Sequence, residues 1–235
     1  KDILEKTNYK TKYGFCFDLN SSIIRKNPLN LVKAFNLLND ESAILILKYR
    51  LPVLNKFINK IEYDTYNEFI LELKKNKNIY CIIDELELLD LYKLYTYFDY
   101  YISPHCGEGF GMTIYDNMIL GNKIISPYYS GEIDYLNRDA IIELDYEEKD
   151  ITELQLHPIY GQMPDVKAAY VSVNNIYKAL IWLDKSPIFL IDCQPLQHEF
   201  RGIGRYGINL VNTIIENNKE YKIFLLINNF LEKKL

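Results

Sequence analysis

The sequence has 235 residues, a net charge of −5 and a hydrophobic share of 49%, with charges of both signs interspersed along it. This is enough apolar surface for a sizeable core in one large domain, or in one domain with part of another. The mildly acidic balance argues against a nucleic-acid groove along the chain, so we expect no nucleic acid partner. The four cysteines lack the spacing of a metal site and fit a reducing cytosol.

The sequence also bears on location. No apolar run reaches the length of a membrane span, and the first residues lack the apolar core of a signal peptide. We therefore expect a cytoplasmic protein, and peripheral association of the full-length protein with the inner face of the cell membrane stays open. Because Lys1 is not an initiator methionine and Leu235 falls in an element that has just begun, we expect a piece of a longer protein. The abundance of Lys, Asn, Ile and Tyr is typical of an AT-rich, bacterial genome.

Short apolar runs alternate with segments in which apolar residues recur every three or four positions. The runs predict buried strands at Tyr13–Phe17, Ala43–Leu47, Ile79–Ile83, Tyr100–Ser103, Lys123–Ser126 and Ala140–Leu144. The other segments predict helices at Pro28–Leu38, Tyr66–Lys75, Leu88–Phe98 and Thr113–Leu120, and a long closing helix at Val166–Leu183. This alternation predicts an α/β class with a doubly wound, Rossmann-like parallel sheet covered on both faces.

Local signals mark several helix ends. Pro28 stands at the first turn of its helix, with Asn27 as the expected N-cap. Gly121 follows the fourth helix as its expected C′ residue. The row of Leu and Tyr in Leu88–Phe98 lacks the basic face of a membrane-surface helix, so we expect it to pack in the core or between domains.

A break at Lys185-Ser186-Pro187 divides the chain in the sequence pattern. We expect one α/β domain over residues 12–184 and the truncated start of a second over residues 188–235. The second part opens with a predicted strand, a Gly-containing loop, a helix and a strand, which is the pattern of a βαβ unit. These predicted elements are Ile188–Asp192, a helix near Arg205–Asn217, and Tyr221–Asn228.

Residues suited to ligand binding gather in the loop after the strand Tyr100–Ser103. In a doubly wound sheet, ligands bind beyond the carboxyl ends of the strands. Glycines at positions 107, 109 and 111 let the backbone approach a ligand closely. The free N–H groups at the start of the next helix favour an anion such as a diphosphate. Glu108 stands among these glycines, and its carboxylate suits a site that also accepts hydrogen bonds from sugar hydroxyls.

Two further segments are expected to lie at the same end of the predicted sheet, next to this loop. Asp116 follows Glu108 after seven intervening residues, so the two carboxylates can face one elongated ligand, near its sugar and near its ribose. The next strand ends in a loop where Ser130 and Gly131 can direct N–H groups to that ligand. By itself, the segment Gly109-Phe110-Gly111 is equally compatible with an ordinary strand-to-helix turn.

The basic pair Arg25-Lys26 lies before a helix, where the first predicted strand has ended. In isolation such a pair is most often a solvated helix start. Its position beyond the carboxyl end of a strand favours phosphate binding instead.

These segments together resemble the family 4 glycosyltransferases of the GT-B fold. The C-terminal domains of that family carry E-G-F-G, a second Glu after seven residues, then a strand and a Ser-Gly or Gly-Gly loop. The matching segments here are Ser103-Pro104-His105-Cys106-Gly107-Glu108-Gly109-Phe110-Gly111, Asn117–Ile125, Tyr129-Ser130-Gly131, Phe17-Asp18, Arg25-Lys26-Asn27-Pro28, Ala34-Phe35, Met163-Pro164-Asp165-Val166 and Ala168-Ala169. The resemblance covers about residues 12–184.

The resemblance implies a retaining glycosyltransferase that moves a glycosyl group from a nucleotide diphosphate sugar to a saccharide or lipid-linked acceptor. It implies no metal and no cofactor beyond that donor. Glu108 would contact the transferred sugar and support charge at the anomeric carbon, and Lys26 would neutralise the diphosphate; these two are the expected catalytic residues. The expected donor-binding residues are Arg25, Gly109, Phe110, Gly111, Asp116, Ser130 and Gly131.

The sequence departs from the family pattern at two places. Asp116 replaces the second Glu and is one methylene shorter. An Arg that often precedes the Lys is replaced by Leu19-Asn20-Ser21, so Arg25 or a partner domain would substitute for it. A degenerate, non-catalytic module that binds nucleotide within a tandem protein therefore stays open as the alternative.

The segment after the break has a resemblance of its own. Phe189–Gln197 and Phe200–Tyr206 look like the first strand and Gly loop of a GT-B N-terminal domain. This implies a tandem glycosyltransferase of the sort that builds bacterial surface polysaccharide. The acceptor would bind mainly to a GT-B N-terminal domain that lies outside this chain, so we expect the isolated chain to be inactive or nearly so.

The remaining aromatic and histidine residues near these segments are less specific. His105 is expected to pack within its loop, because a retaining enzyme of this type needs no general base from this domain. His157 and His198 stand alone and are expected to be structural or exposed. The pair Tyr128-Tyr129 could stack on the donor or simply pack, and the sequence leaves both open.

Overall fold

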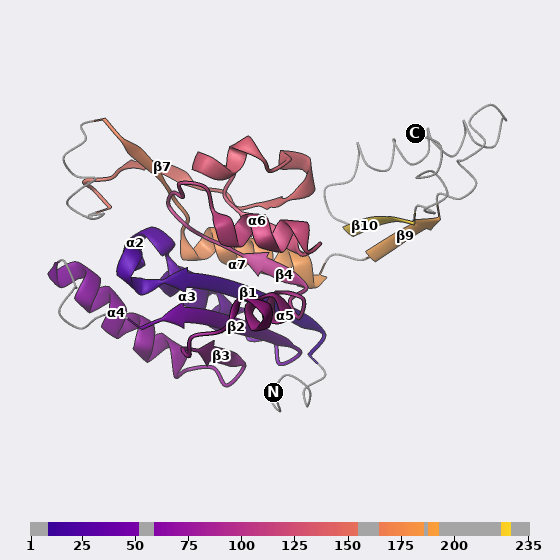
Figure 1. Cartoon of the computed structure of the whole chain (residues 1–235), viewed down its shortest axis with the longest axis horizontal. Helices are drawn as coiled ribbons and strands as arrows, with labels where there is room; N and C mark the ends of the chain where they lie inside the picture. Colours follow the sequence, from indigo (N-terminus) through magenta and orange to yellow (C-terminus); the bar gives the residue numbers. More distant parts are fainter. Residues whose placement is uncertain (1–8, 52–58, 155–164, 186–187, 193–221, 227–235) are drawn as a thin grey trace. The chain divides into compact units, whose positions relative to one another are not determined.

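A six-stranded parallel sheet forms the centre of the computed structural model (Figure 1), which describes residues 9–51, 59–154, 165–185, 188–192 and 222–226. Its strands are β1 (Thr11–Asp18), β2 (Ala43–Arg50), β3 (Ile79–Ile82), β4 (Tyr100–Ile102), β5 (Lys123–Ser126) and β6 (Ile142–Glu143). They lie in the order β3-β2-β1-β4-β5-β6, and every neighbouring pair is parallel. The predicted Rossmann-like α/β class is confirmed.

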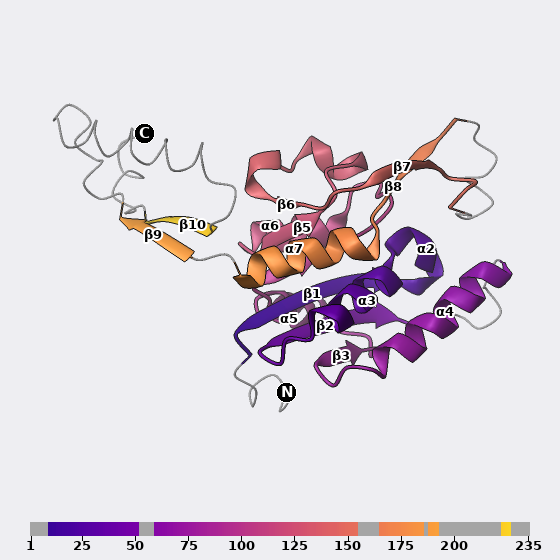
Figure 2. The same cartoon turned by 180° about the vertical axis from the view of Figure 1, so that it is seen from behind.

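Helices cover both faces of this sheet. They are α2 (Ile23–Lys26), α3 (Pro28–Leu38), α4 (Lys60–Leu73), α5 (Leu88–Tyr95), α6 (Met112–Ile119) and α7 (Val173–Lys185). Figures 1 and 2 show α3 and α7 on one face and α5 and α6 on the other. Right-handed crossovers account for α3 and α6 lying on opposite faces, because α3 leads from β1 to β2 and α6 leads from β4 to β5, in opposite directions along the sheet. No helix in the described ranges is both long and apolar enough to cross a membrane.

The core lies around the central strands. Leu45, Ile46 and Leu47 of β2 are wholly buried, which explains why the strand reads as an unbroken apolar run: helices cover both of its faces. Gly14 of β1 is required by close packing, because a Cβ there would lie 2.1 Å from the ring of Phe98. The central strands are therefore fixed rigidly enough to position the loops at their ends.

The predicted closing helix is wrong at its start. Lys167–Tyr170 forms β8, which pairs antiparallel with β7 (Glu147–Asp150), and α7 begins only at Val173. Apolar residues in this segment fit both a strand and a helix period, and pairing with the distant β7 decides between them. The hydroxyl of Ser172 accepts the N–H of Asn175 at 3.2 Å, which helps to mark the true helix start.

Other element ends also differ from the prediction. α4 begins at Lys60 rather than six residues later, because the Asn59 side chain accepts the N–H of Glu62 as an N-cap. Asn27 does not cap α3 through its side chain: its backbone is left-handed, with φ 57°, and its amide donates to the carbonyls of Pro104 and Val171. Gly121 does follow α6 with φ +84°, as predicted.

The sixth strand is shorter than predicted, because a 3-10 turn at Arg138–Ala140 precedes β6. The chain divides into two compact units, Lys1–Leu180 and Ile181–Leu235. In the second unit β9 (Ile188–Asp192) and β10 (Lys222–Leu226) are parallel, with Ile188 opposite Lys222. The helix predicted near residues 205–217 lies outside the described residues, and the domain ranges 12–184 and 188–235 stay predictions.

Candidate functional site

The candidate site lies where the direction of strand addition reverses, between β1 and β4. Strands on either side of such a point lead into connections that run to opposite faces, which leaves a crevice beyond their carboxyl ends. The segment after β1 contains a 3-10 turn, Leu19–Ser21, and α2, while the loop 103–111 follows β4. A second 3-10 turn, Ser130–Asp134, follows β5.

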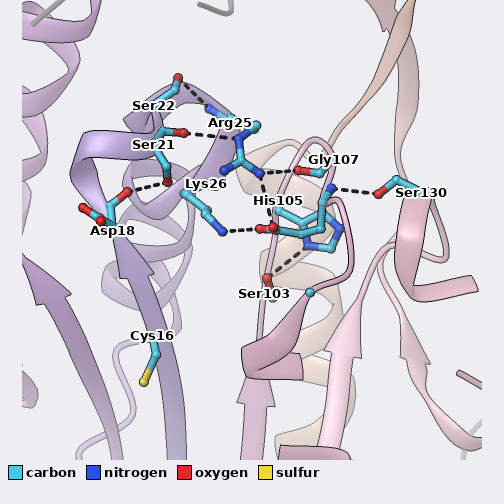
Figure 3. A network of polar contacts seen from close by, with 12 residues as sticks. Cys16, Asp18, Ser21, Ser22, Arg25, Lys26, Ser103, His105, Gly107 and Ser130 are labelled. Atoms are coloured by element: carbon cyan, nitrogen blue, oxygen red, sulfur yellow. Dashed lines mark hydrogen bonds and ion pairs between the residues drawn. The ribbon is translucent and has the colours of Figure 1, made fainter. Parts of the chain in front are cut away.

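The segment after β1 is folded by its own short side chains. The Asp18 carboxylate accepts the N–H of Asn20 at 2.8 Å, and the Ser22 hydroxyl accepts the N–H of Arg25 at 3.3 Å. Such local bonds hold the backbone in tight turns. They place Arg25 and Lys26 in the last turn of α2, facing the loop after β4 (Figure 3).

Two cations meet one carboxylate at this point. Lys26 Nζ forms an ion pair with Glu108 Oε1, and Arg25 Nη1 lies 3.2 Å from Glu108 Oε2 (Figure 3). Arg25 Nη1 also donates to the Gly107 carbonyl at 2.7 Å, while the Cys106 N–H donates to the Arg25 carbonyl at 2.8 Å. The two loops are thus joined through both side chains and backbone, although their residues lie far apart in sequence.

Electrostatics keep this cluster ionised. Burial alone would raise the pKa of Glu108, but nearby positive charge, that of Lys26 above all, holds it below its ordinary value. Burial lowers the pKa of Lys26, and the charge of Glu108 acts against that shift. One carboxylate between two cations leaves a net positive charge, which suits an anionic ligand.

A pocket of about 290 Å³ lies beside the cluster. Of the expected site residues, Arg25, Glu108, Gly109 and Ser130 line it. Gly109 is exposed, and a Cβ added to it would meet no atom within 4 Å, so a ligand has room to approach its backbone.

Comparison with solved structures places this arrangement in a known architecture. No protein-family model and no curated protein matches the sequence. The chain is similar to the C-terminal domain of a glycosyl transferase group 1 family protein, LpcC, from Francisella tularensis, with 13% identity, a TM-score of 0.52, and coverage of 91% of this chain and 90% of that one. The chain has the GT-B C-terminal fold.

Two larger enzymes contain a part with a similar fold. A UDP-forming α,α-trehalose-phosphate synthase from Burkholderia vietnamiensis matches with 7% identity, a TM-score of 0.54 and coverage of 89% of this chain. A trehalose-6-phosphate synthase studied for glycosyl transfer with retention matches with 8% identity, a TM-score of 0.50 and coverage of 91% of this chain. The chain spans only 42% and 47% of these two proteins.

Other expected donor residues of the GT-B domain lie outside the pocket lining. The ring of Phe110 packs on Tyr115 and Tyr135, with centroids 5.3 and 4.9 Å apart, and Gly111 caps α6 with φ +74°. The Tyr135 hydroxyl donates to the Gly111 carbonyl at 3.1 Å. These contacts shape the loop, and the parts that we expect Phe110 and Gly111 to play at the donor stay predictions.

Asp116 lies in the second turn of α6, outside the pocket lining. Burial raises its pKa. Tyr135 lies near it: burial and then the charges of Glu132, Glu108 and Asp116 raise the pKa of that tyrosine. The side chain of Asp116 has no hydrogen-bond or ion-pair partner in the part of the chain that the structure describes, and its expected contact with a ribose stays a prediction.

The glycine after β5 is held tightly against the loop after β4. The Gly131 N–H donates to the Glu108 carbonyl at 3.1 Å, so in this conformation it serves the contact between loops. A Cβ at Gly131 would lie 1.6 Å from the Gly109 carbonyl oxygen, which only glycine allows. A direct contact of Gly131 with the donor stays a prediction.

Sequence reasoning missed Lys167 in the lining of the pocket. Tyr129 lines the pocket as well, and its hydroxyl donates to the Lys167 carbonyl at 2.9 Å. Lys167 escaped notice because its strand was predicted as helix. The Tyr129 ring packs on Tyr146, with centroids 5.4 Å apart, which supports packing rather than stacking on the donor.

His105 is wholly buried, but it joins two loops rather than packing only within its own, because its ring contacts both Ser103 and Glu132 of the turn after β5. His157 and His198 lie outside the described residues. In the described ranges no group of three or more His, Cys, Asp or Glu side chains is arranged to hold a metal ion. The absence of a metal requirement stays a prediction.

The charge cluster predicts a pH dependence of stability. A carboxyl group whose pKa is lower in the folded state stabilises the fold above its unfolded value, near 4.3, and this stability is lost as pH falls through the folded value. Wild type should therefore lose more free energy of unfolding between pH 6 and pH 3 than Glu108→Gln. Urea unfolding of both proteins over this range measures the difference, and parallel pH profiles would contradict it.

Proposed function

We propose that the chain is the donor-binding half of a retaining glycosyltransferase. The observation that carries this proposal is the meeting of Arg25, Lys26 and Glu108 beside a pocket of about 290 Å³ at the switch point of the sheet. A nucleotide diphosphate sugar presents two negative phosphates next to a ring rich in hydroxyl groups. The cluster offers cations for the first and a carboxylate for the second.

In the proposed reaction the cations act on the leaving group. Lys26 and Arg25, with the N-terminus of α6, would stabilise the negative charge that develops on the departing diphosphate. Because their positions are fixed before the donor binds, little reorganisation is needed during the reaction. Glu108 would accept hydrogen bonds from the transferred sugar and support positive charge at its anomeric carbon. This scheme uses no metal and no further cofactor.

The neighbouring structures support the finer parts of the proposal. One is UDP-forming and another was studied for transfer with retention, which favours a nucleotide donor and retention here as well. The acceptor would be a saccharide or a lipid-linked saccharide in surface polysaccharide synthesis, bound mainly by a GT-B N-terminal domain of the same protein. Such a protein would work in the cytoplasm, with peripheral attachment to the membrane where the acceptor lies.

Calorimetric titration tests the proposal. The chain is titrated with UDP, GDP and sugar nucleotides of each, and at least one is expected to bind at submillimolar concentration. Glu108→Gln should bind the sugar nucleotide about fivefold more weakly relative to the matching nucleoside diphosphate than wild type does. The reason is that one hydrogen bond to the sugar is weakened. No binding of any nucleotide at millimolar concentration would contradict the proposed function.

A non-catalytic nucleotide-binding module is the second candidate. It is favoured by Asp116, which is shorter than the family's glutamate and lies outside the pocket lining. Glycosyl transfer by the full-length protein separates the two, because a module that only binds or connects would not respond to Glu108→Gln.

A further inference from the structure

A chain of buried polar side chains lies next to the candidate site, and Figure 3 shows two of its members, Ser103 and His105, joined by a hydrogen bond. His105 and Glu132 are wholly buried, and Ser103 is 2% exposed. His105 Nε2 lies 2.6 Å from Glu132 Oε1, and His105 Nδ1 lies 3.0 Å from the Ser103 hydroxyl. None of these three residues lines the pocket, so none of them contacts a ligand there directly.

The chain continues from Glu132 to the carboxylate of the site. The Ser130 hydroxyl donates to Glu132 Oε2 at 3.2 Å and accepts the backbone N–H of Glu108 at 2.8 Å. Both oxygens of Glu132 are therefore engaged, one by His105 and the other by Ser130. The loops after β4 and β5 are joined through this serine.

The Glu132 carboxylate sets the direction of every bond in the chain. An ionised carboxylate can only accept hydrogen bonds. The Ser130 hydroxyl must therefore donate its hydrogen bond to Glu132 and accept one from the Glu108 N–H. His105 must carry a proton on Nε2 in order to donate to Glu132. A neutral His105 then accepts the Ser103 hydroxyl at Nδ1.

Two costly features coincide at this point. A buried carboxylate costs desolvation free energy that its hydrogen bonds must offset, so stability alone does not explain Glu132. Ser130 also has φ 73°, a left-handed backbone that is unfavourable for a residue other than glycine. Unfavourable features that are held in place by surrounding bonds are typical of sites that need one fixed geometry.

We propose that His105 and Glu132 are positioning residues for Glu108. The buried pair orients the Ser130 hydroxyl, and that hydroxyl accepts the backbone N–H of Glu108. Arg25 and Lys26 fix the Glu108 side chain through their ion pairs. That this positioning matters for a sugar donor rests on the proposed function. The link from His105 and Glu132 through Ser130 to the Glu108 backbone is a property of the folded chain, so it can be tested without nucleotide.

Hydrogen exchange at the Glu108 amide, followed residue by residue by NMR, is the test. Exchange is expected to be at least about 10-fold faster in Ser130→Ala and in Glu132→Ala than in wild type. Ser126→Ala is the matched control, because Ser126 is a wholly buried serine at the end of β5 whose hydroxyl has no partner in the described structure. Its Glu108 amide should exchange at the wild-type rate.

Glu132→Gln supplies the conservative variant. A glutamine can accept from Ser130 and donate to His105 Nε2, provided that the imidazole proton moves to Nδ1. Glu108 protection should then be kept, while the ¹⁵N spectrum of His105 shows the proton on Nε2 in wild type and on Nδ1 in Glu132→Gln. If Glu132 only filled buried space, the two variants would not differ in this way. Loss of Glu108 protection in Glu132→Ala and its retention in Glu132→Gln therefore indicate the hydrogen bonds.

Two outcomes would overturn the proposal. One is an unchanged exchange rate of the Glu108 amide in folded Ser130→Ala, a variant that removes one partly exposed hydroxyl and leaves the buried pair intact. The other is a wild-type His105 whose Nε2 carries no proton. Failure of wild type to bind nucleotide would instead count against the proposed function, and the exchange rates would still decide this inference.

Discussion

Lys26→Met is expected to bind nucleoside diphosphates about 10- to 100-fold more weakly than the wild-type chain. The Lys26 ammonium lies in the cluster with Glu108 and Arg25, and its side chain is only 14% exposed. A hydrogen bond to a charged group contributes about 1.5–3 kcal/mol, and each 1.4 kcal/mol is a factor of ten in affinity. Isothermal titration with UDP and GDP measures the change.

Lys33→Met is the matched control for this prediction. Lys33 lies on α3, seven residues further along the chain, and pairs with Glu68 on α4 at 2.6 Å. Its loss removes one positive charge without touching the cluster of Arg25, Lys26 and Glu108. A folded Lys26→Met protein with wild-type affinity, or an equal loss in Lys33→Met, would show that nucleotide is not held by the cluster.

Gly131→Ala is expected to lower the free energy of unfolding of the first unit by about 2–3 kcal/mol, a fall of about 4–12 °C in Tm. The added methyl would meet the backbone carbonyl of Gly109, and backbone cannot swing aside as a flexible side chain can. Relief requires the loops after β4 and β5 to separate. That separation breaks the Gly131 N–H bond to Glu108, so nucleotide binding should fall together with Tm.

Gly109→Ala separates the two effects. Its Cβ would meet nothing within 4 Å, so its Tm should stay within about 2 °C of wild type, while any ligand that approaches this backbone would be hindered. Thermal unfolding and nucleotide titration of both variants give the comparison. Equal Tm values for Gly131→Ala and Gly109→Ala would contradict the close contact between the loops.

Much of the fold could be predicted because the strands are buried on both faces. The prediction gave β2 its correct first residue, Ala43, and ended it three residues early, at Leu47 rather than Arg50. It succeeded because an unbroken apolar run is typical of a central parallel strand. Lys167–Tyr170 could not be assigned this way. Its four residues have no decisive period of their own, and the strand exists because β7 lies beside it.

The candidate site divides in the same manner. That Lys26 and Glu108 would meet could be predicted, because each follows a strand end and those strands are neighbours in a doubly wound sheet. The role of Glu132 could not be predicted. Only the 3-10 turn Ser130–Asp134 directs this carboxylate inward to His105, and its sequence alone reads as an exposed acidic loop.

The pairing of β1 with β4 also has a consequence for folding. The ion pair between Lys26 and Glu108 joins residues 82 apart in sequence. Ordering so long a loop costs entropy before the contact is made, and structures built on such contacts form slowly. β1, α3 and β2 can pair as soon as they are synthesised, whereas the charge cluster must wait for β4 and, for its full support, for residue 132. Until then Arg25 and Lys26 are cations without their carboxylate, so the contacts of the charge cluster form after those of β1, α3 and β2.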